Sequence, residues 1–230
     1  MLRKLLVAIA AFGAALGASA CSYGSAVDIA PMNARISKPV IAPGDYCEVK
    51  GETAPFSVIS KEDCAPLIWN AATRTYTMKD PDKPAEDMTA PVIRIDGNLY
   101  AAQITTSDAK GPDAKGEDRY QLYTFVASGN AFVMISPLDD EPLEALAAKT
   151  KKLTFKPAKD GRPYIAAGKP EDIRAFLKDA ARESLRIRKK DDDVSIGIRD
   201  IAGAPDHSAG KQQQKDIEAV LAAVKALTPK

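Results

Sequence analysis

Three cysteines and a single histidine are the side chains most able to do chemistry in this sequence. The histidine, His207, lies in a polar stretch near the C-terminus. Nucleophilic triads, Cys–His pairs and His-rich zinc sites all need a histidine in the folded domain, so their chemistry is not expected here. Cys47 and Cys64 have no CxxC partners and are better placed to form a disulfide than to bind zinc. From these residues we predict no catalytic residue, no metal site and no cofactor.

The first 20 residues have the features of a cleaved secretory leader. Arg3 and Lys4 supply positive charge, an uncharged apolar run continues to Leu16, and small residues occupy positions 18–20. The apolar run is shorter than the roughly 20 residues that span a bilayer. We therefore predict that residues 1–20 are a signal peptide and that the mature protein works outside the cytoplasm.

Cys21 directly follows these small residues, and two processing routes compete for it. Signal peptidase I would leave it as the first residue of a soluble periplasmic or secreted protein. Alternatively, Ala18-Ser19-Ala20-Cys21 resembles a bacterial lipobox, with Ala18 at the position where Leu is common. The resemblance implies that Cys21 carries a lipid, which would anchor the protein to a membrane of the cell envelope.

The number of cysteines favours the lipidated form. An odd thiol in an oxidising compartment invites mispairing. A lipid on Cys21 leaves an even pair, Cys47 and Cys64. A disulfide that closes a loop of this size stabilises the folded protein by roughly 3 kcal/mol in the chain-entropy model. Bacterial lipidation adds several acyl chains, and more than one chain makes anchoring stable.

Composition points to a globular envelope protein. The chain has 230 residues, of which 45% are hydrophobic and 27% charged, and its formal net charge is +1. These proportions support one domain with a real core. The interspersed charges argue against a nucleic-acid partner, which needs a basic footprint.

Composition and hydrophobic patterning divide the chain into four parts. Residues 1–20 are the leader, and 21–42 lack periodicity and contain Pro and Gly, as a flexible tether does. Residues 43–188 are predicted to form a single globular domain. Residues 189–230 are predicted to be a polar tail that ends in an amphipathic helix. That helix either docks on the domain or binds a partner, and its apolar stripe is Ile217, Val220, Leu221 and Val224.

Paired apolar segments around turn residues predict a hairpin-rich sheet. The predicted strand pairs are 67–69 with 73–78, 92–95 with 99–104, 120–127 with 131–135, and 153–155 with 164–166. Helical spacing follows at 142–147 and from 170 onward. We therefore predict an α+β domain whose antiparallel sheet can roll toward a barrel, with helices from the C-terminal half.

The second helix carries a line of cations, spaced every four residues: Arg174, Lys178, Arg182 and Arg186. Such a stripe can meet anionic lipid head groups or envelope polymers. Asp179 and Glu183 lie close by and dilute its charge, so a solvated helix face is the competing interpretation.

These features favour a non-enzymatic, lipid-anchored envelope module that binds a protein or polymer, and they leave enzymatic activity uncertain. One alternative is a hydrolase acting on envelope polymers through carboxylates that the sequence alone does not identify. Another is an inhibitor or sensor that presents the polar loop 107–118 to a partner. Two buried acids in a pocket would favour the hydrolase, and a filled sheet interior would favour the binding module.

Overall fold

The computed structural model describes residues 22–50, 57–58, 64–79, 87–105, 120–157, 163–187, 196–199 and 211–228. The strands are β1 (Tyr23–Ser25), β2 (Gly44–Lys50), β3 (Ser57–Val58), β4 (Ala65–Asn70), β5 (Thr75–Met78), β6 (Met88–Asp96), β7 (Leu99–Thr105), β8 (Tyr120–Ser128), β9 (Ala131–Ile135), β10 (Thr154–Pro157), β11 (Pro163–Ala167) and β12 (Ile196–Arg199). The helices are α2 (Asp140–Lys149), α3 (Pro170–Ile187) and α4 (Lys211–Leu227).

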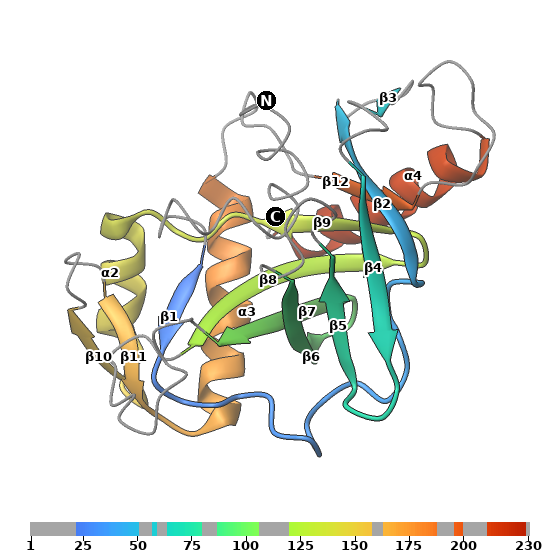
Figure 1. Ribbon diagram of the computed structural model, residues 1–230. Helices are drawn as coiled ribbons and strands as arrows, with labels where there is room; N and C mark the ends of the chain where they lie inside the picture. Colours follow the sequence, from blue (N-terminus) through green and yellow to red (C-terminus); the bar gives the residue numbers. More distant parts are fainter. Residues whose placement is uncertain are drawn as a thin grey trace, which may run out of the picture.

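Within these residues, eight strands close into an antiparallel barrel in the order β8-β7-β6-β5-β4-β2-β12-β9, and β9 pairs with β8 to complete the ring. Neighbours around the ring follow the chain, as in an up-and-down barrel, except that α2, β10, β11 and α3 intervene between β9 and β12. The α+β prediction with a barrel-like sheet is confirmed (Figure 1).

The local turn signals gave the right strand pairs. β6 pairs with β7 across Gly97, whose φ of 51° is in the left-handed region that glycine adopts without strain. The pairs β4–β5, β8–β9 and β10–β11 are also antiparallel. The register within each pair puts alternate side chains inside the barrel.

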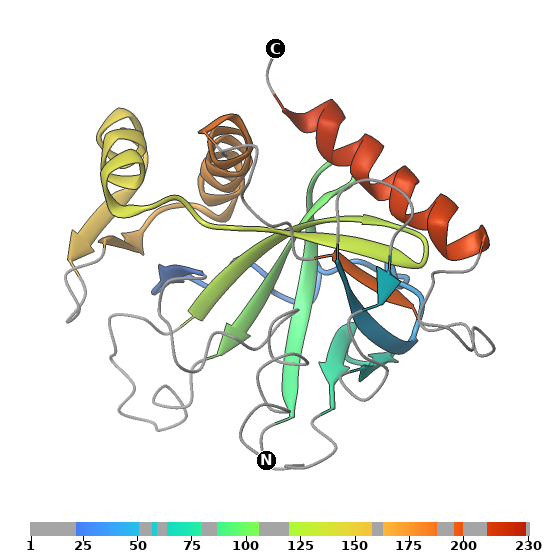
Figure 2. The ribbon, with the colours of Figure 1, turned by 90° about the horizontal axis from the view of Figure 1, so that it is seen from above.

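A smaller layer extends from the outside of the barrel. β1 pairs with β8 and, in parallel, with β11, which carries β10 at the edge. α3 packs its apolar face here, with Ile173, Phe176, Leu177 and Ala180 buried as the helical spacing predicted. Figure 2 shows α2, α3 and α4 along one side of the molecule.

The segment 22–42 is not the tether that its composition predicted. Ile29 and Ile41 are fully buried, and Tyr23 is 4% exposed. The side chain of Gln103 accepts a hydrogen bond from the backbone N–H of Ile29 at 2.8 Å. The segment therefore packs on the domain, because its scattered apolar residues find partners that are distant in sequence.

Tyr76 forms hydrogen bonds with the backbone near the C-terminal end of the segment 22–42. The hydroxyl of Tyr76 accepts a hydrogen bond from the N–H of Ile41 at 2.9 Å and donates one to the Ile41 carbonyl at 2.7 Å. We expect Tyr76→Phe to leave both backbone groups buried without partners and to cost about 2 kcal/mol of unfolding free energy. Urea unfolding would measure the loss, and amide exchange should rise at Ile41. Unchanged exchange there would contradict this role.

The predicted tail, 189–230, is also part of the domain where it is described. β12 completes the barrel between β2 and β9. Ile217 and Val220 of α4 are fully buried against the barrel wall, so the terminal helix docks on the domain. The rest of the predicted linker, 189–195 and 200–210, lies outside the described residues.

Candidate functional surface

The outer face around Ile68, Thr77 and Thr89 is not covered by a described helix, whereas α3 contacts the other end of β6 at Asp96. Figure 2 shows the helices on the opposite side of the barrel from β4 and β5. On this face Ile68 of β4 lies opposite Thr77 of β5, and Thr77 lies opposite Thr89 of β6. We call these three residues and their surroundings the Ile68–Thr77–Thr89 face.

The strand alternation explains why these residues point outward. The residues that flank them in sequence, such as Leu67 and Tyr76, point into the barrel and are buried. Ile68 is 46% exposed, which makes it one of the most exposed large apolar side chains among the described residues. Because the side chains before and after them in each strand pack inside the barrel, Ile68, Thr77 and Thr89 must point outward.

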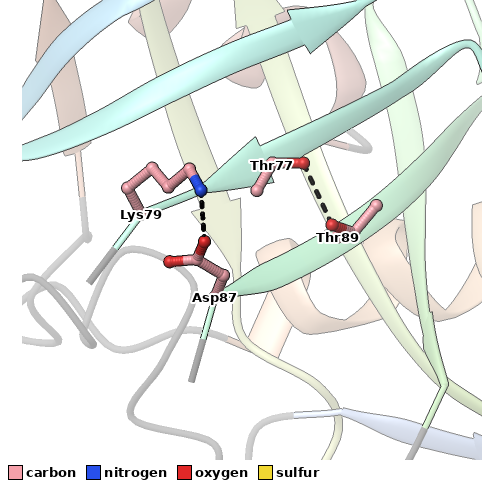
Figure 3. Close-up of polar contacts among 4 residues, drawn as sticks. All are labelled: Thr77, Lys79, Asp87 and Thr89. Atoms are coloured by element: carbon pink, nitrogen blue, oxygen red, sulfur yellow. Dashed lines mark hydrogen bonds and ion pairs between the residues drawn. The ribbon is translucent and has the colours of Figure 1, made fainter. Parts of the chain in front are cut away.

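Polar side-chain contacts join two of the three strands, β5 and β6, along this face (Figure 3). The hydroxyls of Thr77 and Thr89 are 3.0 Å apart, and Lys79 forms an ion pair with Asp87 at the end of the same strands. Cross-strand threonine pairs stabilise sheets and hold their hydroxyls in register. The result is a rigid surface that mixes methyl groups, hydroxyls and one apolar side chain, which suits contact with a protein or polymer rather than acid–base chemistry.

Side chains of the protein fill the barrel interior. Its buried residues include Tyr46, Leu67, Tyr76, Met78, Val92, Tyr100, Tyr123, Phe125 and Phe132. The rings of Tyr100 and Phe125 stack with centroids 5.6 Å apart. An eight-stranded barrel is just wide enough to be filled in this way.

The buried tyrosines are held in their neutral form. Burial raises the pKa of Tyr76 to about 12 and also raises the pKa values of Tyr23 and Tyr46. Each of the three hydroxyls has a hydrogen-bond partner in the backbone: Tyr23 with Leu138, Tyr46 with Ala42 and Tyr76 with Ile41. They are structural groups that link the barrel to the segments around it.

Cys47 and Cys64 form the predicted disulfide, with their Cα atoms 4.2 Å apart. Tyr46 pairs with Ala65 across β2 and β4, which places Cys47 of β2 next to Cys64, the residue before β4. Cys21, His207 and the loop 107–118 lie outside the described residues. The prediction of a lipid on Cys21 therefore stays a prediction.

The structure places the four predicted cations on α3, but it pairs three of them with carboxylates. Lys178 Nζ lies 2.7 Å from Asp96 Oδ2, and Arg182 Nη2 lies 3.9 Å from the same oxygen. Arg186 forms two hydrogen bonds with Glu183, at 2.6 and 2.7 Å. The stripe is consequently weaker as an anion site than its spacing implied.

The pKa values agree with this pairing. The hydrogen bond from Lys178, with its positive charge, lowers the pKa of the Asp96 carboxyl. The hydrogen bond from Arg186 lowers the pKa of Glu183 in the same way. Both carboxylates stay ionised at neutral pH, which is the opposite of what a general acid requires.

Sequence reasoning missed a buried polar cluster at the N-terminal segment. Gln103 is 5% exposed, donates to Asp28 Oδ1 at 2.8 Å and accepts from the Ile29 N–H. Arg174 of α3 reaches the Ile29 carbonyl at 3.4 Å. The one available signal was a glutamine inside an otherwise apolar strand. Its partners are 74 and 75 residues away in sequence, so no local pattern pointed to them.

Thr124 of β8 has a buried hydroxyl without a hydrogen-bond partner among the described residues. We expect Thr124→Val to raise the unfolding free energy by about 1 kcal/mol, because valine has the same shape and removes an unsatisfied group. Thr75→Val is the matched control, since the buried Thr75 hydroxyl is 2.8 Å from that of Thr73 and its loss should destabilise. Urea midpoints that move in the same direction for both variants would contradict the assignment.

Comparisons with known proteins give no match to this chain among family models, curated proteins or solved structures. Within the described residues, no cluster of three or more His, Cys, Asp or Glu could hold a metal ion. None of the described helices is long and apolar enough to cross a bilayer.

Proposed function

We propose that this protein is an exported lipoprotein, attached to an envelope membrane through Cys21, whose barrel is a non-enzymatic binding module. The partner is another envelope component, a protein or a polymer, and the binding surface is the Ile68–Thr77–Thr89 face. The observation that carries the proposal is a contrast within the barrel. Aromatic side chains fill the interior, whereas Ile68 is 46% exposed on an uncovered outer face.

Two further observations support binding at this surface rather than chemistry elsewhere. The apolar stripe of the terminal helix packs on the domain, because Ile217 and Val220 are fully buried, so this helix does not offer that stripe to a partner. The sheet face around Ile68 remains available as an apolar contact surface. The disulfide between Cys47 and Cys64 fits a location outside the cytoplasm, where disulfides persist.

The anchor is tested by intact mass spectrometry of the mature protein from its native host. A diacylglyceryl group on Cys21 is the expected result. An N-terminus with an unmodified thiol, or a precursor that stays whole in the cytosol, would refute the lipoprotein proposal.

The binding face is tested by placing a photo-crosslinking amino acid at Ile68 and, as a control, at Ala148, which is exposed on α2. We expect a discrete adduct in intact cells at Ile68 and none at Ala148. Thr89→Lys, which puts a charge on the exposed face, should remove the adduct without unfolding the barrel. An adduct that forms equally at both positions, or that survives Thr89→Lys, would contradict the proposed face.

A further inference from the structure

We infer that the side of the barrel formed by β1, β8 and α3 lies against the phospholipid bilayer, and that the Ile68–Thr77–Thr89 face points away from it. This inference rests on the proposed lipid attachment at Cys21 and adds an orientation to it. The partner at this side is the bilayer that holds the Cys21 lipid.

The first observation is that only a short length of chain separates Cys21 from the folded domain. Ser22 is already half-buried, and Tyr23 is 4% exposed. The Tyr23 hydroxyl accepts a hydrogen bond from the Leu138 N–H at 2.9 Å, and its ring centroid lies 5.9 Å from that of Phe176. Two residues of extended chain reach at most about 7 Å, so a lipid on Cys21 would hold this side of the domain at the head groups.

The second step is the position of β1 on the barrel. Tyr23 pairs with Leu122, so β1 lies along β8. In the closed ring β4 is the strand opposite β8, reached through β7, β6 and β5 in one direction or β9, β12 and β2 in the other. A membrane on the side of the molecule where β1 lies therefore turns β4, with its exposed Ile68, toward the aqueous side.

The third step is the chemistry of the surface next to β1. Ser184 of α3 donates a hydrogen bond to the Ser136 carbonyl at 2.6 Å, two residues from the Leu138 that Tyr23 holds. One turn further, Ile187 is 39% exposed at the end of α3. The stretch from Ser136 to Leu138 therefore connects the last turns of α3 to the hydroxyl of Tyr23.

Cations flank this exposed isoleucine. The Arg186 side chain is 54% exposed and Arg182 is 42% exposed, while Lys149 of α2 is close enough to help lower the pKa of Glu183. Glu183 offsets the charge of Arg186, and Asp96 lies 3.9 Å from Arg182. An apolar side chain among cations fits the interface of a bilayer with anionic lipids.

The experiment compares two tryptophan variants of the lipidated full-length protein, Ile187→Trp and Ile68→Trp. Both replace an exposed isoleucine, and the native Trp69 on β4 serves as a common reference. The proteins are reconstituted in phosphatidylethanolamine–phosphatidylglycerol vesicles with lipids that carry a doxyl quencher near the head group. We expect Ile187→Trp to lose most of its added emission and Ile68→Trp to lose no more than the wild type.

A spacer variant shows whether the short connection is the cause. A Gly/Ser insert of about ten residues between Cys21 and Ser22, roughly 17 Å in root-mean-square length, should relieve the quenching of Ile187→Trp. Equal quenching of both variants, or quenching that the spacer does not relieve, would overturn the orientation, even with the Cys21 lipid present in the mass spectrum of the same sample. A mass spectrum with unmodified Cys21 would instead refute the anchor and the orientation together.

Discussion

We expect Gly197→Ala to destabilise the protein by about 3 kcal/mol, at the upper end of the usual cost of overpacking a core. Gly197 of β12 lies opposite Phe132 of β9, and a Cβ atom at Gly197 would overlap two atoms of the Phe132 ring and crowd a third. The ring has no room to move, because Phe132 is fully buried and in contact with the rings of Tyr46 and Phe125. The added methyl group must therefore displace the backbone of the strand that completes the barrel.

Gly168→Ala is the matched control for this prediction. A Cβ atom there would also overlap a neighbour, but the atom it meets is the terminal methyl group of the Leu153 side chain, which can rotate away. We expect a cost below about 1 kcal/mol for this variant, since only one flexible side chain has to adjust. Urea unfolding of both variants gives the comparison. Equal losses would show that the rigidity of the Phe132 ring is not what limits position 197.

The features that the sequence predicted correctly are local. The hairpin β6–β7 followed from apolar strands around Asp96-Gly97, and the buried face of α3 followed from helical spacing. The disulfide followed from cysteine parity. In each case the deciding residues are neighbours in the chain, or the number of possible partners is very small.

The features that the sequence did not predict depend on distant contacts. β12 is only four residues long, in a stretch with the composition of a linker, and it is a strand because β2 and β9 leave a gap of one strand between them. The segment 22–42 has the Pro and Gly of a tether, yet Gln103 and Tyr76 bind its backbone. Flexible composition therefore did not exclude burial.

The candidate surface was only partly predictable. The sequence predicted that 73–78 pairs with 67–69 as a strand, but which face of that strand would be exposed depends on barrel closure. The cationic stripe was placed correctly on α3. Its pairing with Asp96 was not predicted, because Asp96 belongs to a hairpin that is distant in sequence and approaches α3 only in the folded chain.

We also expect stability to fall steeply above pH 10, by about 4 kcal/mol between neutral pH and pH 11, because three tyrosines each contribute roughly 1.4 kcal/mol per pH unit. Burial raises the pKa values of Tyr23, Tyr46 and Tyr76 above the ordinary tyrosine value of about 10. The unfolded chain therefore loses these protons near pH 10, whereas the folded chain keeps them. The stabilisation is fully present below pH 10 and is lost as the pH rises toward the folded pKa values.

Urea unfolding at pH 8, 10 and 11 measures this decline, and absorbance at 295 nm reports whether the tyrosines ionise only on unfolding. Tyr46→Phe provides the internal check, since its ring is retained at a fully packed position and one titrating group is removed. Its alkaline loss should be smaller than that of the wild type by about one third, because each buried phenol contributes a similar amount. A decline of the same size in both proteins, or full tyrosine ionisation near pH 10 in the folded state, would mean that water reaches these hydroxyls. The conclusion that side chains fill the barrel interior, on which the proposed binding function depends, would then be wrong as well.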